Sequence, residues 1–211
     1  MRAEMIDAIQ GERSVFINCP FDEEYQPLFQ AVMFAVARCG FFPRCSLEGA
    51  DSGEVRIEKI AKMIGECRYG IHDLSRVELS SGTDLPRFNM PFELGLFLGA
   101  RRFGGPKQRR KVCLVLDSAP YRYQAFLSDI AGQDIRAHGN APRRVVTHIR
   151  DWLRDASQDA SIPGGDEVHR RYEQFQSDLP RLCRDAHLLP KELTFLDLST
   201  LISEWLSDAV R

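Results

Sequence analysis

The chain has 211 residues, of which 44% are hydrophobic, so it can bury one full core and a small addition to it. Lys and Arg together number 28 against 30 Asp and Glu, and this near balance argues against a general nucleic-acid or membrane-surface binder. The N-terminal residues lack the apolar stretch of a signal peptide, no apolar run is long enough to span a bilayer, and the six cysteines are scattered as in a reduced protein. We therefore expect a soluble, cytoplasmic protein with no membrane partner.

Short apolar runs alternate with amphipathic segments through most of the chain. The run at 111–117 is the most continuous, as expected for a strand in the middle of a parallel sheet. In chain order, the predicted elements are a strand at 13–18, a helix at 27–39, a strand at 41–47, a helix over 55–67, a strand at 69–75, a helix from Met90, a strand at 111–117, a helix at 121–131, an edge strand at 134–138 and a helix at 143–156. This alternation predicts an α/β fold with a doubly wound, flavodoxin-like parallel sheet of five strands.

A Ser-, Pro- and Gly-containing linker follows the last of these helices at residues 157–165. Beyond it, apolar periodicity predicts a helix at 166–178, a continuation broken at Pro180, and a last helix at 195–210. Amphipathic helices need a partner for their apolar stripes, so we expect these to pack on the sheet domain or on a second copy of the chain. The predicted domains are an α/β domain at 1–156 and a C-terminal helical extension at 157–211.

The segment from Arg87 to Arg101 predicts a loop that turns into a helix. Pro91 suits the first turn of a helix and Asn89 can cap it, so we expect the helix to begin near Met90 and to carry Glu93 in its first turn. The stripe expected to be buried is Phe92, Leu96, Gly99 and Phe103. Gly95 and Gly99 lie one turn apart, which indicates close packing of this helix on the sheet.

In an open parallel sheet, ligands bind beyond the carboxyl ends of the strands, where the direction of the connections reverses. The loops after the first three predicted strands should line this crevice, and Glu93 should enter from the following helix. A long polar loop at 77–88, with Ser-Ser-Gly-Thr-Asp at its centre, is also more typical of function than of a plain connection. The residues expected to line the crevice are Asn18, Pro20, Phe21, Asp22, Tyr25, Glu48, Asp51, Ser52, Asp73, Ser75 and Arg76.

The pattern Asp73-Leu-Ser, followed by Asn89-Met-Pro-Phe-Glu-Leu-Gly-Leu-Phe-Leu-Gly-Ala100, resembles the superfamily shared by nucleoside 2-deoxyribosyltransferases and Toll/interleukin receptor (TIR) domains. The deoxyribosyltransferases have Glu-hydrophobic-Gly at this point, which Glu93-Leu94-Gly95 matches, and bacterial and plant TIR domains have Glu-Leu. The resemblance covers roughly residues 13–150 in architecture. Asn89-Met90-Pro91-Phe92 stands where TIR domains carry a Ser/Cys/Trp pattern.

The resemblance implies cleavage or transfer of an N-glycosidic bond on NAD or a related nucleotide, which is a substrate rather than a cofactor. In such reactions a carboxylate stabilises or traps a sugar oxocarbenium ion, and Glu93 would do so here. Asp73 would hold the sugar hydroxyls, Arg76 or the amides of the Glu93 helix would bind a phosphate, and Asn89 would contact the substrate. The family also implies a role in bacterial stress or phage defence. A homo-oligomer is expected separately, with the C-terminal helices as a candidate dimer surface.

Other interpretations remain open. The same fold can serve as a non-catalytic nucleotide-sensing or protein-interaction module, and Glu93 can be an ordinary helix-start acid worth roughly 0.3 to 1 kcal/mol. His72 is more typical of a core or edge residue than of a base, and the other histidines share no metal spacing. The basic run 107–111 is typical of a solvated loop, with polyanion binding as the alternative.

Overall fold

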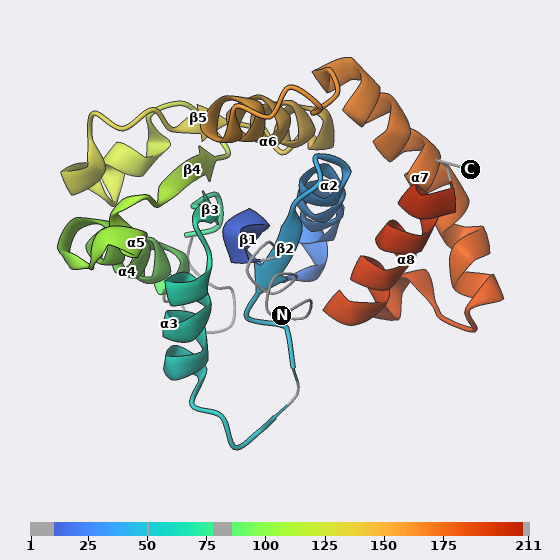
Figure 1. Ribbon diagram of the computed structural model, residues 1–211, viewed down its shortest axis with the longest axis horizontal. Helices are drawn as coiled ribbons and strands as arrows, with labels where there is room; N and C mark the ends of the chain where they lie inside the picture. Colours follow the sequence, from blue (N-terminus) through green and yellow to red (C-terminus); the bar gives the residue numbers. More distant parts are fainter. Residues whose placement is uncertain (1–10, 50, 78–85, 209–211) are drawn as a thin grey trace.

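The computed structural model describes residues 11–49, 51–77 and 86–208 (Figure 1). Its centre is one sheet of five parallel strands in the order β2-β1-β3-β4-β5, with helices on both faces. The strands are β1 (Ser14–Asn18), β2 (Phe42–Cys45), β3 (Tyr69–Asp73), β4 (Val112–Asp117) and β5 (Arg136–Ala137). This strand order is that of the flavodoxin-like fold, so the predicted fold class is confirmed.

The helices are α2 (Gln26–Arg38), α3 (Arg56–Glu66), α4 (Asn89–Phe103), α5 (Pro106–Arg109), α6 (Pro142–Ser157), α7 (Gly165–Asp185) and α8 (Phe195–Asp208), and the 3-10 segments are η1 (Glu23–Tyr25), η2 (Arg122–Ala125), η3 (Ser128–Ile130) and η4 (Pro190–Glu192). Val15 and Ile17 of β1 pack in one core with α2 and α6, whereas Phe16 packs with α3 and α4. Because side chains alternate between the faces of a strand, α2 and α6 cover one face and α3 and α4 the other.

The connections reverse direction between β1 and β3, which are neighbours in the sheet. The chain leaves β1 toward β2 and leaves β3 toward β4, so the carboxyl ends of β1 and β3 flank the switch point. Asn18 pairs with His72 in the register of these two strands. The residues that follow, Cys19 and Asp73, therefore lie side by side at the edge where the ligand crevice was expected.

The C-terminal helices α7 and α8 pack against α2, and α7 also packs against α6, so they extend the core on that side of the sheet (Figure 1). The expectation that their apolar stripes are buried on the rest of the chain is confirmed. The predicted break at Pro180 is wrong, because α7 continues through it to Asp185. An internal proline costs about 3 kcal/mol, and burial of Leu179 and Cys183 on either side of it offsets that cost.

The helix α4 differs from its prediction in register. It begins at Asn89, with Phe88 as an N-cap that makes no side-chain hydrogen bond, so Asn89 is the first helical residue and Glu93 lies beyond the first turn. Phe92 and Phe103, expected to be buried, are 56% and 85% exposed. The buried face is instead Met90, Glu93, Leu94 and Phe97. Because almost every residue from 90 to 100 is apolar, several stripes satisfy the helical period and only packing selects one.

The expected close packing at the glycines of α4 is also wrong. A Cβ added at Gly95 or Gly99 would have no atom within 4 Å apart from its own helix and chain neighbours. The close approach occurs on the strand, where a Cβ at Gly70 would lie 2.7 Å from Phe97 and 2.8 Å from Nε2 of His72. Gly70 therefore allows α4 to pack directly onto β3.

Two further expectations need correction. Residues 121–131 form η2 and η3 instead of a helix, and they pack their apolar side chains against Leu74 and Val115. In the basic run 107–111, Lys107, Arg109 and Arg110 are exposed as expected, but residues 107–109 belong to α5 instead of a loop. Lys111 is only 2% exposed and donates hydrogen bonds to the carbonyl oxygens of Ile64 and Cys67. Within the described ranges, no helix is long and apolar enough to cross a membrane.

Candidate functional site at the carboxyl edge of the sheet

The carboxyl group of Glu93 is the least satisfied acid at this edge of the sheet. Glu93 is 7% exposed, and no described residue donates a hydrogen bond to it. Burial raises its pKa from 4.5 to about 7, and the positive charge of Arg56, at the start of α3, opposes this only in part. Leu94 and Phe97, buried on the same face of α4, hold the carboxyl against the sheet rather than in solvent.

Asn18 fixes the start of α4 to the sheet. Its Nδ2 donates a hydrogen bond to the carbonyl oxygen of Met90 (2.8 Å) and lies 3.0 Å from Nδ1 of His72. Burial, and then the charge of Lys111, lower the pKa of His72 to about 3, so this ring is neutral. His72 is a fully buried residue, as its position in the sequence favoured. Asn18, expected to contact substrate, uses its amide to position α4, three residues before Glu93.

Asp73 lies on the opposite face of the sheet from His72 and is fully buried. The hydroxyl of Tyr25 donates to its Oδ2 (2.6 Å) and the backbone N–H of Ser75 donates to its Oδ1 (2.8 Å). Nε2 of His138 lies 3.1 Å from Oδ2, at ion-pair distance but not aligned for a hydrogen bond. Burial alone would raise the pKa of Asp73, but His138, Ser75 and Tyr25 together lower it. Asp73 is therefore an ionised group that ties three loops together.

The first loop brings an ion pair rather than a free cation to the crevice. Asp22 accepts from the backbone N–H of Tyr25 (3.1 Å) and lies 3.2 Å from Nη2 of Arg76. Glu24 lies 2.6 Å from Nη1 of the same arginine, so two carboxylates balance its charge. Pro20 is buried, and Phe21 packs edge-to-face on Phe29 with the ring centroids 5.5 Å apart. These contacts position Tyr25 over Asp73.

The acidic side chains of the second loop make their hydrogen bonds within that loop or with the end of β2. Glu48 accepts hydrogen bonds from Nε of Arg44 (2.6 Å) and from the backbone N–H of Cys45 (3.0 Å), which closes the turn after β2. Asp51 accepts from the backbone N–H of Gly53 (2.9 Å), and Ser52 is exposed. The side chains of Glu48 and Asp51 therefore stabilise their own turns. After this loop, Arg56 begins α3: its Nη2 donates to Oγ of Ser46 (2.9 Å), and its positive charge lowers the pKa of Glu93.

Asn89 and Ser75, two other residues predicted to contact the substrate, differ from each other in exposure. Asn89 is exposed at the first residue of α4, whereas Ser75 is buried and its Oγ has no hydrogen-bond partner among the described residues. The centre of the polar loop predicted at 77–88 lies outside the described residues.

Cys19 connects the two carboxylates. Burial raises the pKa of its thiol well above the usual value, and the neighbouring acids Cys45, Asp73 and Glu93 raise it further. Because both carboxylates act on the same thiol directly after β1, they lie on either side of the end of that strand. The structure thus brings Asp73 and Glu93 to one edge, although they point to opposite faces of the sheet.

Three polar residues that the sequence did not single out also lie at this edge. Asp117 ends β4 and is fully buried, accepting from Nε of Arg122 (2.8 Å). Arg122 also donates to the carbonyl oxygen of Leu74 (2.8 Å), and His138 follows β5. Asp117 could have been found in the same way as Asp73, because each is the acid at the end of a continuous apolar strand. No comparable signal marks Arg122 or His138.

A hollow of about 980 Å³ runs beside β2, away from these carboxylates. It is lined by Phe42, Leu47, Phe195 and Leu196 among others, and Glu48 is the one predicted site residue on its wall. Its lining contains neither Asp73 nor Glu93. The chemistry of the candidate site therefore depends on the arrangement of the carboxylates and not on this apolar hollow.

Comparison of the chain with protein-family models, with curated proteins and with solved structures found no match in any of the three. The functional argument therefore rests on the residues of the site. In the part of the chain that the structure describes, no three His, Cys, Asp or Glu side chains form a group that could hold a metal ion.

Proposed function

We propose that the chain cleaves or transfers an N-glycosidic bond of NAD or a related nucleotide, with Glu93 as the reacting carboxylate. The observation that carries this proposal is the state of Glu93: 7% exposed, without a hydrogen bond from any described residue, and with a pKa of about 7. Buried polar groups are normally hydrogen-bonded, because burial without a partner costs several kcal/mol. A carboxyl kept in this state at the ligand edge of a parallel sheet is typical of a functional site.

The reaction would use the ionised form of Glu93. As the bond between the sugar C1′ and the nitrogen breaks, its electron pair goes to the nitrogen and positive charge develops on the sugar. A pKa near 7 lets Glu93 ionise when this charge, or the cationic nicotinamide of NAD, lies beside it. With water as acceptor, NAD would give nicotinamide, ADP-ribose and one proton. For a neutral base, protonated Glu93 would supply the proton to the leaving group.

In this proposal Asp73 is a positioning residue. Its lowered pKa and the raised pKa of Glu93 show that their environments separate the two acids, as in sites where two carboxyl groups have different roles. Asp73 would orient Tyr25 and the first loop. The Oγ of Ser75, which has no hydrogen-bond partner among the described residues, would accept a hydrogen bond from a sugar hydroxyl. Arg56 is the better candidate for a ligand phosphate than Arg76, which is held by two carboxylates.

Of the remaining predicted contacts, Phe21, Asp22 and Asn89 would form the outer wall of the site, whereas Pro20 is buried in the first loop. On this proposal the protein acts in the cytoplasm, as a homo-oligomer, in stress or phage defence. The protein would be incubated with NAD, nucleotides and nucleosides, and the mixtures separated by chromatography while thermal stabilisation by each compound is measured. We expect release of nicotinamide or a free base from at least one of them. Absence of both product and stabilisation with every compound would contradict the proposal.

A second function is favoured by one observation. Both oxygens of Asp73 already have partners, so Glu93 is the single unengaged carboxylate of the pair. One such carboxylate suffices for a site that binds a nucleotide without turning it over. Stabilisation by a nucleotide without product would therefore favour the sensing module over the enzyme.

A further inference from the structure

The sheet is incomplete along one side of β4. β5 has two residues, and it pairs only with Leu116 and Asp117 at the end of the six-residue β4. Alternate residues of β4 direct their backbone groups to the β3 side. The N–H of Val112 donates to the carbonyl oxygen of Arg68, just before β3, and the carbonyl oxygen of Leu116 accepts from the N–H of Leu74, just after it. The residues of β4 between them direct theirs outward. The N–H and C=O of Cys113 and the N–H of Val115 therefore have no strand partner among the described residues.

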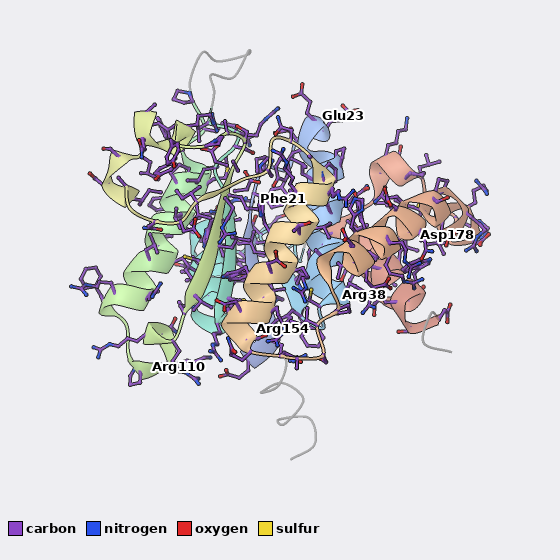
Figure 2. The ribbon with its side chains drawn as sticks, turned by 90° about the horizontal axis from the view of Figure 1, so that it is seen from above. Phe21, Glu23, Arg38, Arg110, Arg154 and Asp178 are labelled. Carbon is purple, nitrogen blue, oxygen red and sulfur yellow. The ribbon has the colours of Figure 1, made fainter. Side chains whose placement is uncertain are left out.

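A groove follows this open edge. It has a volume of about 700 Å³, and its floor is formed by Cys113, Leu114 and Val115. Figure 2 shows β4 running between α4, in green, and α6, in pale orange, and the same arrangement is visible in Figure 1. Side chains of both helices form the walls, among them Leu98 and Trp152. The space is where the missing part of β5 would lie in a full-length strand.

We propose that this groove binds an extended peptide segment of a partner protein, which completes the sheet by pairing with Cys113 and Val115. Main-chain hydrogen bonds to an unpaired strand edge are a general mode of peptide recognition. Side chains of the added strand would alternate between the walls of α4 and α6. The edge is recessed between two helices, so it admits a single strand, whereas the sheet edge of a second copy would bring its own α4 and α6 into the same space.

The walls also specify the charge of the partner. Asp151 and Asp155 of α6 line one wall, and Arg101 of α4 lines the other. Asp151 is paired with Arg150 (3.0 Å), but neither Asp155 nor Arg101 has an ion-pair partner among the described residues. A strand with basic side chains on the face toward α6 and apolar ones toward Leu98 would satisfy this arrangement. The site is separate from Glu93 and does not depend on the proposed function.

The test uses a synthetic seven-residue peptide of alternating lysine and valine, with fluorescence anisotropy for binding and amide hydrogen exchange for location. We expect binding that slows exchange at the amides of Cys113 and Val115. A peptide of the same length with proline at alternate positions should not bind, because it lacks the N–H groups that pair. Asp155→Lys, at an exposed position, should weaken binding roughly fivefold, since it reverses one wall charge.

Val115→Pro provides a second variant, because the N–H that it removes points outward and belongs to no described hydrogen bond. It should abolish binding, and it should also lower the thermal unfolding temperature, because the buried Val115 side chain packs in the core with Leu74. Val115→Ala is the matched control: it loses the same packing but keeps the N–H, so it should still bind the peptide. Binding that protects other amides would overturn the proposal, as would an absence of binding up to the solubility limit of the peptide. If sedimentation showed a dimer without peptide, and hydrogen exchange showed that both amides are already protected in that dimer, the groove would belong to a second copy. That result would also overturn the proposal.

Discussion

Replacement of Glu93 by glutamine should stabilise the fold in a pH-dependent way. Burial raises the pKa of Glu93 from its ordinary 4.5 to about 7, so the folded state holds this proton at pH values where the unfolded chain releases it. Below pH 4.5 the group is protonated in both states and costs nothing. Between pH 4.5 and about 7 the folded state binds more protons, so the free energy of unfolding falls as pH rises. Above pH 7 the loss is complete.

The size of this loss follows from the two pKa values. At about 1.4 kcal/mol for each tenfold change in acid dissociation constant, the rise from 4.5 to about 7 corresponds to roughly 3 kcal/mol. Glu93→Gln removes the ionisation, so its stability relative to wild type should increase between pH 5 and pH 8 by an amount of this order. Any cost of burying the amide group is the same at every pH and does not alter the slope.

The assay is urea unfolding of both proteins at several pH values and constant ionic strength, with Glu204→Gln, at an exposed position on α8, as the matched control. The difference between Glu93→Gln and wild type should rise with pH, whereas the difference for Glu204→Gln should stay nearly flat. A difference that does not change with pH would refute the buried, unpaired state of Glu93, and with it the reason for assigning it a function.

Two further predictions test the packing and the hydrogen bonds around the site. Gly70→Ala should destabilise the protein by about 2 kcal/mol, because the new Cβ meets Phe97 at 2.7 Å, whereas Gly95→Ala, with open space around it, should stabilise by roughly 0.5 to 1 kcal/mol. Tyr25→Phe should cost about 2 kcal/mol, because the hydroxyl donates to buried, ionised Asp73, and this cost should shrink below pH 3.8, where the unfolded carboxyl is protonated. Urea unfolding measures the free energy of unfolding in each case. Equal effects of the two alanine substitutions would contradict the packing prediction. A cost of Tyr25→Phe that is unchanged at low pH would contradict the hydrogen-bond prediction.

The arrangement of strands and helices followed from local patterns. Each segment that was predicted as a strand contains one. The central strands β1, β3 and β4 carry mostly apolar side chains because a parallel strand covered on both faces is buried, whereas the outer strands β2 and β5 are less apolar and less buried. The sheet order then follows from right-handed crossovers, which place successive helices on defined faces. Asp73 was proposed from its position at the end of a strand, and Glu93 from its position near the start of the next helix together with the family resemblance.

What the sequence could not predict depends on contacts between distant segments. The partners of Asp73 are Tyr25 and His138, far away in the chain, and no local pattern connects them. The buried face of α4 was ambiguous because its residues are nearly all apolar, and the glycine that allows close packing is Gly70 on β3 rather than one of the helix glycines. Glu93 could be marked as an acid of interest, but the absence of a hydrogen-bond donor to it among the described residues appears only when α3, α4 and β1 are assembled.

The most direct measurement of the central claim compares turnover by wild type and Glu93→Gln on NAD and on any nucleotide that stabilises the wild-type fold, with Glu204→Gln as control. The glutamine retains the shape of the side chain but not the charge that opposes an oxocarbenium ion, so turnover should fall on the order of a hundredfold or more. Ligand-induced thermal stabilisation should change far less, and the control should match wild type. Equal turnover by Glu93→Gln and wild type would contradict the account.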